Sequence, residues 1–149
     1  MRYFPLCVVL ALALSGCGRD SADADVLETR TVTLPNGARI RAEVKIRPFD
    51  MQRGMMFRDA LPQGEGMLFI HAEPGNYPYW MYNVRIPLDI IWLDANRRIV
   101  EISADTPPCK TRASECPTYG GKARSQYVLE IGGGEAARYG LKVGDTLVF

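Results

Sequence analysis

The chain of 149 residues is poor in metal-binding side chains, and it has no excess of charge of either sign. His71 is the only histidine, and the four cysteines provide no second close pair, as a typical zinc site would require. The 18 basic residues are balanced by 17 acidic ones, so the composition indicates neither a nucleic-acid-binding face nor a polybasic membrane patch. We therefore expect no metal site, no cofactor and no nucleic-acid partner.

The usual motifs of nucleophilic catalysis and phosphate binding are also missing. No Gly-x-Ser-x-Gly elbow occurs, and His71 directly follows an apolar run at 66–70, which is typical of a histidine at the rim of a core. The glycines at 132–134 lack the spacing of a phosphate-binding loop. We interpret them as a turn from a strand into a helix.

Long hydrophobic runs are confined to the N-terminus. The run from Phe4 to Leu14 is too short for a permanent bilayer span but typical of a signal peptide. Later apolar runs have only strand length, so we expect no transmembrane helix after cleavage. Residues 18–30 are small and charged, as in a flexible spacer.

The residues Ser15 and Gly16 before Cys17 resemble the lipobox of bacterial lipoproteins. This resemblance implies a signal peptide at 1–16, acylation of Cys17, a linker over 17–30, and a protein held at the cell envelope facing the periplasm. Several acyl chains would anchor it stably. Because Gly18 rather than Asp follows Cys17, we expect the outer membrane rather than the inner one.

Cys109 and Cys116 are the cysteines left for the folded part. In an exported chain, two cysteines this close in sequence favour a disulfide. The polar segment between them fits a stapled surface loop.

The pattern of the remaining chain predicts a single, mainly β domain of sandwich or barrel type with one or two short helices. A hairpin is expected around the turn at 35–37. Asp50 is expected to cap a short helix, and Gly140 to end another. The expected strands lie at 31–34, 40–46, 66–70, 79–82, 88–93, 99–102, 127–131 and 146–149.

Six blocks occur in an order that resembles the prokaryotic domain-of-unknown-function family 192. They are Arg53-Gly54-Met55-Met56-Phe57-Arg58, Gly66-Met67-Leu68-Phe69, Trp80-Met81-Tyr82-Asn83, Ile86-Pro87-Leu88-Asp89, Val128-Leu129-Glu130 and Gly144-Asp145. The resemblance covers residues 31–149 and implies a compact β domain that is often secreted or lipid-anchored, with no established reaction. The family pattern has Lys and Thr where this chain has Tyr82 and Val84, so no role is expected for a cation at position 82.

Methionine is one candidate for site chemistry, because thioethers favour Cu(I). The methionines concerned are Met51, Met55, Met56, Met67 and Met81. They fall among aromatic residues rather than in a dense exposed run, so we interpret most of them as filling gaps in the core.

Asp89 and Glu130 each interrupt an apolar strand. On neighbouring strands they could form an acid/base pair. The alternative is structural, with the carboxylates in water or paired with Arg53, Arg58 or Arg85.

A cluster of aromatic residues around Trp80 is the main candidate for ligand binding. With amide and guanidinium donors nearby, aromatic faces suit a sugar or a peptide. The alternative is that Trp80 belongs to the core and the tyrosines cover a sheet edge. The candidate binding residues are Arg53, Tyr79, Trp80, Asn83 and Asp89, with Tyr77 and Tyr82 beside them.

The sequence thus favours a lipid-anchored envelope domain that binds a glycan, peptide or protein without catalysing a reaction. The first alternative is an envelope hydrolase that uses Asp89 and Glu130. The second is a structural or assembly factor.

Overall fold

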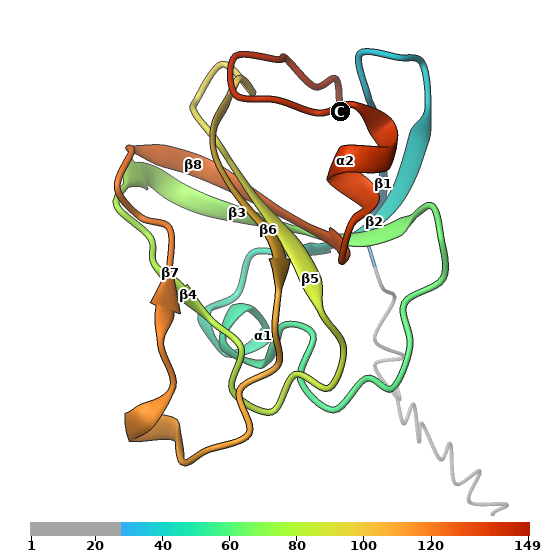
Figure 1. Cartoon of the computed structure of the whole chain (residues 1–149). Coiled ribbons are helices and arrows are strands. Elements are labelled where there is room, and N and C mark those ends of the chain that lie inside the picture. Colours follow the sequence, from blue (N-terminus) through green and yellow to red (C-terminus); the bar gives the residue numbers. More distant parts are fainter. Residues whose placement is uncertain (1–27) are drawn as a thin grey trace, which may run out of the picture.

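The computed structural model describes residues 28–149, which form an open six-stranded sheet and a small second sheet (Figure 1). The predicted signal peptide and Cys17 lie outside the described residues. The large sheet has the order β1-β2-β3-β8-β5-β6, and β4 pairs with β7. The strands are β1 (Thr29–Thr33), β2 (Arg39–Lys45), β3 (Glu65–Gly75), β4 (Tyr79–Trp80), β5 (Leu88–Leu93), β6 (Ile99–Thr106), β7 (Thr118–Tyr119) and β8 (Ser125–Gly132).

The predicted N-terminal hairpin is confirmed. β1 and β2 pair antiparallel with Val32 opposite Ile40, and both side chains are fully buried. Gly37 has a φ of 84° in the connecting turn, where a glycine carries no steric cost.

β2 and β3 run parallel, which requires a crossover connection between them. This crossover, residues 46–64, carries the short helix α1 (Pro48–Arg53). The prediction that Asp50 caps the helix was wrong: Pro48 occupies the first helical turn, where its fixed φ fits, and Asp50 lies inside the helix, bonded to the Arg47 side chain. The helix ends before Gly54, so Met55 and Met56 follow it.

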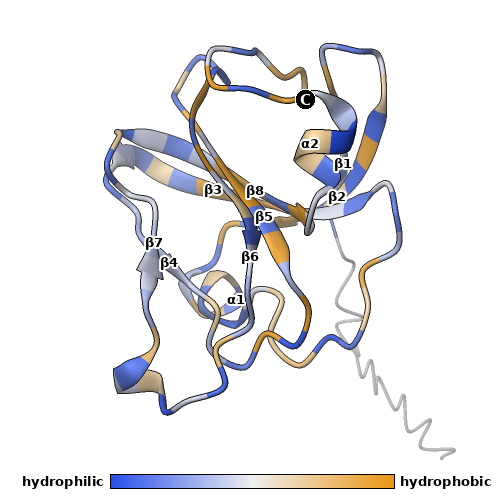
Figure 2. Ribbon diagram, in the orientation of Figure 1, coloured by the Kyte–Doolittle hydropathy of each residue, from blue (hydrophilic) through white to orange (hydrophobic). Residues whose placement is uncertain are grey.

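Both faces of the large sheet are covered by other parts of the chain, and a separate hydrophobic core lies on each face. Helix α2 (Glu135–Tyr139) and the C-terminal segment lie over one face, and α1 with the β4-β7 sheet lies over the other (Figure 1). The central strands β5 and β8 are the most hydrophobic (Figure 2). The α2-side core includes Val32, Ile40, Leu68, Ile91, Leu93, Leu129 and Ile131. The α1-side core includes Met55, Met67, Phe69, Met81, Leu88, Ile90, Trp92 and Val128.

The C-terminal part follows the sequence pattern except at its end. Gly140 ends α2 with a φ of 72°, as predicted. The predicted strand at 146–149 was wrong, because Thr146 and Val148 make only isolated bridges. Leu147 between them is buried in the α2-side core, so packing fixes this segment.

Cys109 and Cys116 form the expected disulfide. The loop they close leads into β7, whose Thr118 pairs with Trp80 of β4. The Cys109 amide also donates to the Met81 carbonyl at 3.1 Å. The disulfide loop therefore supports the segment that carries Trp80.

The mainly β, single-domain prediction is confirmed, with two short α-helices. The large sheet is open and does not close into a barrel. No helix within residues 28–149 is long and apolar enough to cross a bilayer. Both cores and all the strand pairings above lie within these residues.

Candidate functional site

A groove of about 380 Å³ lies between the crossover and the segment that begins at β4. This volume falls within the range of small-molecule sites. Its lining residues come from two parts of the chain: Phe49, Gln52, Arg53, Met56 and Phe57 from the crossover, and Trp80 and Tyr82 from β4 and the residues after it. We call this the aromatic groove.

Two phenylalanines of the aromatic groove are unusually exposed. Phe49 is 75% exposed and Phe57 is 51% exposed. Grouped large apolar side chains at a surface often mark a binding site. Trp80 and Tyr82 add two further rings, 5.3 Å apart between centroids.

Phe57 is held in an unusual backbone conformation. Its φ is 66°, a left-handed value that is rare for a bulky residue. The Phe57 amide donates to the Asn83 carbonyl at 2.8 Å, and Asn83 is itself left-handed with a φ of 57°. The Arg85 guanidinium lies 5.9 Å from the centre of the Phe57 ring. Strained residues of this kind cluster at functional sites.

A second cavity of about 310 Å³ adjoins the aromatic groove. The two share Arg53, Met56 and Phe57, whereas the rest of the second lining is mostly polar: Lys45, Asp50, Gly54 and Arg58. We call it the basic cavity. Apolar and cationic surfaces therefore meet at Arg53.

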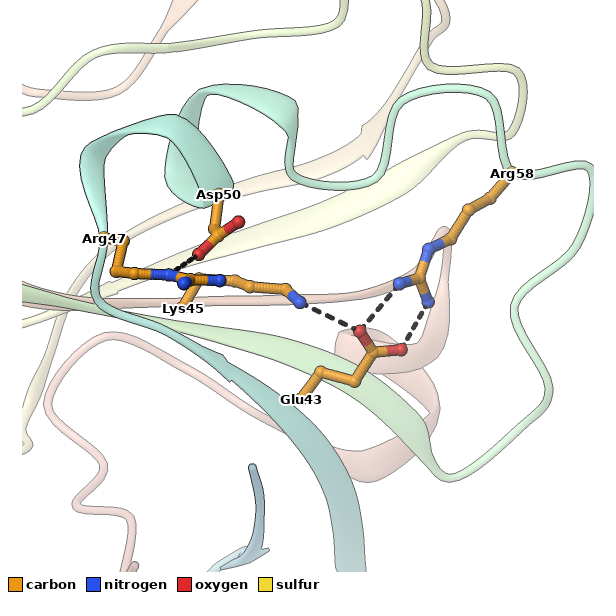
Figure 3. Close-up of polar contacts among 5 residues, drawn as sticks. All are labelled: Glu43, Lys45, Arg47, Asp50 and Arg58. Atoms are coloured by element: carbon orange, nitrogen blue, oxygen red, sulfur yellow. Dashed lines mark hydrogen bonds and ion pairs between the residues drawn. The ribbon is translucent and has the colours of Figure 1, made fainter. Parts of the chain in front are cut away.

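Glu43 organises two cations of the basic cavity (Figure 3). Arg58 donates two hydrogen bonds to its carboxylate, at 2.6 and 2.7 Å, and the Lys45 ammonium lies 3.3 Å from it. The hydrogen bonds from Arg58 lower the pKa of Glu43 in spite of its partial burial. Lys45 and Arg58 are thus held in fixed positions.

Glu130 lies below the aromatic groove on the α1 side of the sheet. It is 4% exposed, and its Oε2 atom has no hydrogen-bond partner among the described residues. Glu130, Trp80 and Tyr82 are among the residues that line a small cavity of about 30 Å³, which has room for about one water molecule. Burial raises the pKa of Glu130 to about 8, and the Arg58 charge opposes this only in part.

Tyr79 and His71 form a half-buried pair behind the groove. The His71 Nε2 atom lies 3.2 Å from the Tyr79 hydroxyl, and the His71 ring stacks on Tyr77 with centroids 3.5 Å apart. Burial lowers the pKa of His71 to about 4 and raises the pKa of Tyr79. His71 therefore has satisfied contacts, as its position after the apolar run indicated.

Asp89 does not line the groove, so its assignment as a binding residue was wrong. It is fully buried on the α2 side of the sheet. Its carboxylate accepts three backbone hydrogen bonds, from Asp105 at 2.6 Å, Gly134 at 3.0 Å and Ala136 at 2.6 Å. It joins the start of α2 to the end of β6.

The proposed acid/base pair is also contradicted by the sheet register. Asp89 stands opposite Ile131, and Glu130 stands opposite Ile90. Because neighbouring residues of a strand point to opposite faces, the two carboxylates project into different cores. They cannot act on one bound substrate, and within residues 28–149 neither carboxyl is hydrogen-bonded to or ion-paired with an arginine.

The structure brings together only some of the predicted binding residues. Arg53 and Trp80 line the aromatic groove. Tyr79 packs behind it against Phe69 and Trp92. Asn83 lines a further cavity of about 320 Å³, which shares Phe57 with the aromatic groove and includes Cys109 of the disulfide in its lining.

Three groove residues were absent from the sequence analysis as site residues: Phe49, Gln52 and Phe57. The signal was present in part, because each phenylalanine is followed directly by a charged residue, Asp50 after Phe49 and Arg58 after Phe57, in a segment without strand alternation. The methionines mostly follow the core interpretation, since Met55, Met67 and Met81 are at most 1% exposed. Met56 lines the groove.

The fold and the groove define a small, mainly β domain with an external ligand-sized site. The family model of DUF192, described as "Uncharacterized ACR", matches residues 31–149. The chain belongs to this family. No curated protein matches the chain.

Two solved structures are similar to it. A protein of unknown function from Novosphingobium aromaticivorans is 33% identical, with a TM-score of 0.74, and the match covers 85% of this chain and 89% of that one. A Sinorhizobium meliloti protein described as "a putative transcription regulator" is 25% identical, with a TM-score of 0.69, covering 79% and 89%.

Proposed function

We propose that this protein is a non-enzymatic, lipid-anchored domain of the cell envelope that binds a ligand in the aromatic groove. The main observation behind this proposal is the pair of exposed phenylalanines, Phe49 and Phe57, in a ligand-sized groove that is also lined by Trp80. Covering one such side chain contributes about 1.5–3 kcal/mol. A ligand with an apolar part would gain this energy.

The envelope location is supported by the lipobox-like sequence that ends at Cys17. The Cys109–Cys116 disulfide agrees with it, because disulfides persist in oxidising compartments outside the cytoplasm. Gly18 favours the outer membrane in this proposal.

Two other functions have less support. Asp89 and Glu130 cannot act together as the acid and base of a hydrolase, because their side chains lie on opposite faces of the sheet. The description of the Sinorhizobium protein does not extend to this chain, whose described α-helices have only six and five residues. These are short for helices that read a DNA groove.

Calorimetric titration of the domain 28–149 with cell-wall fragments, oligosaccharides, short peptides and amphipathic acids tests the proposal. We expect saturable binding of at least one class, lost in Phe49→Ser. The control is Val143→Ser, which replaces a side chain that is 61% exposed and outside the groove. If no class of ligand binds, or if Phe49→Ser and Val143→Ser bind equally well, the proposal that the groove binds a ligand is refuted.

A further inference from the structure

Arg53 lies where the two cavities meet. It lines both of them, it is exposed in the last turn of α1, and no hydrogen bond or ion pair of its side chain occurs among the described residues. A guanidinium is always charged and offers five donors. Arg53 therefore presents unused positive charge at the end of an apolar surface.

The basic cavity reinforces this charge. Arg58 uses two donor groups on Glu43, and Lys45 makes one contact with it, so both cations keep further donors. The one acid in the lining, Asp50, is bonded to Arg47. Figure 3 shows Lys45 and Arg58 reaching the Glu43 carboxylate from two sides, which holds them near the cavity.

The buried acid below the groove does not cancel this charge at neutral pH. The pKa of Glu130 is raised to about 8 because the side chain is removed from water. The carboxyl is therefore mostly protonated and uncharged near pH 7. The accessible charge of the site remains positive.

We propose, resting on the proposed function, that the ligand is an amphipathic anion. Its apolar body lies on Phe49, Phe57 and Trp80, and its carboxylate or phosphate head lies against Arg53 at the entrance of the basic cavity. A glycan fits this lining less well, because four of the seven groove residues are apolar or indole side chains: Phe49, Met56, Phe57 and Trp80. Sugar hydroxyls need many polar partners.

The test uses three probes with one body: 4-phenylbutyrate, 4-phenylbutyl phosphate and the uncharged 4-phenylbutyramide. Calorimetry on the domain 28–149 gives their dissociation constants. We expect the better anion to bind about tenfold more tightly than the amide, since charge-assisted hydrogen bonds exceed neutral ones. Whichever anion binds more tightly identifies the head group.

Arg53→Gln should abolish the preference for the anion over the amide, because the guanidinium that lines both cavities is removed. The matched control is Arg39→Gln, which removes an exposed arginine of β2 that lines neither cavity. Circular dichroism confirms that both variants are folded. A preference that survives in Arg53→Gln, or is lost equally in Arg39→Gln, would overturn the assignment of the head group.

The outcomes separate the two proposals. Equal binding of amide and anions refutes the anionic ligand and leaves the aromatic groove as a ligand site. Binding of none of the three probes refutes the amphipathic anion. Ligand binding in the groove is then decided by the titrations with cell-wall fragments, oligosaccharides, peptides and amphipathic acids described above. Loss of all binding in Phe49→Ser together with a preserved anion preference in the native domain supports both.

Discussion

The Asp89 carboxylate accepts a hydrogen bond of 2.6 Å from the backbone amide of Ala136, 47 residues further along the chain. This contact fixes the start of α2 to the central strand β5. With the bonds from Asp105 and Gly134 it satisfies the buried charge through backbone donors instead of an arginine. Of the two interpretations that the sequence left open for Asp89, catalytic or structural, the structure supports the structural one.

Asp89→Asn should lower the free energy of unfolding by about 1–3 kcal/mol, because its amide group would replace one accepting oxygen and face a backbone donor. Urea unfolding measures the loss. Asp94→Asn is the control. The Asp94 Oδ1 atom accepts both hydrogen bonds, from the backbone amides of Asn96 and Arg98, and an asparagine keeps an accepting oxygen at this position. Equal stability of Asp89→Asn and the native protein would refute the anchoring role.

Glu130 should make the domain less stable as the pH rises. Its pKa is raised from 4.5 to about 8 in the fold, so between these values the folded state retains a proton that the unfolded state has lost. Stability should therefore fall across this window, by up to about 1.4 kcal/mol per pH unit.

Glu130→Gln mimics the protonated acid and should flatten this dependence, as followed by urea unfolding at several pH values. The exposed substitution Glu73→Gln should preserve the native profile. A native stability that rises between pH 5 and pH 8, with the same rise in Glu130→Gln, would contradict the buried-acid account.

The disulfide should stabilise the domain by about 2.5 kcal/mol, the chain-entropy value for a loop of about eight residues. Adding reductant to the native domain should lower its unfolding midpoint. The double variant Cys109→Ser/Cys116→Ser should start at the lower midpoint and not respond to reductant. A native midpoint that ignores complete reduction would show that the loop needs no covalent closure.

Cys17 should carry the lipid. Metabolic labelling with an alkyne-tagged palmitate should mark the native protein and the Cys7→Ser variant, whose changed residue lies in the predicted signal peptide. Cys17→Ser should lose the label. Labelling that persists in Cys17→Ser would place the acyl group elsewhere or reject the lipobox resemblance.

The sequence predicted local structure well because strand alternation and turn residues act over short distances. The hairpin at Val32 and Ile40 and the glycine end of α2 are examples. It could not assign faces to Asp89 and Glu130, because the register between β5 and β8 depends on contacts far apart in the chain.

The groove was only half predicted for the same reason. Trp80 and Arg53 stood out as residue types that bind ligands, but Phe49 and Phe57 lie in a crossover without periodicity. Their proximity to Trp80 arises only when β2 and β3 pair in parallel and the crossover folds over one face of the sheet. Long-range topology, not local pattern, forms the site.

The two tryptophans provide the most direct test of the groove. Trp80 lines it, whereas Trp92 is fully buried and its Nε1–H donates to the Tyr77 carbonyl at 2.8 Å. In a ¹H–¹⁵N spectrum of the domain titrated with 4-phenylbutyrate, the Trp80 indole signal should shift saturably while that of Trp92 stays in place. A Trp80 signal that does not move, or that moves only together with Trp92, would contradict ligand binding in the aromatic groove.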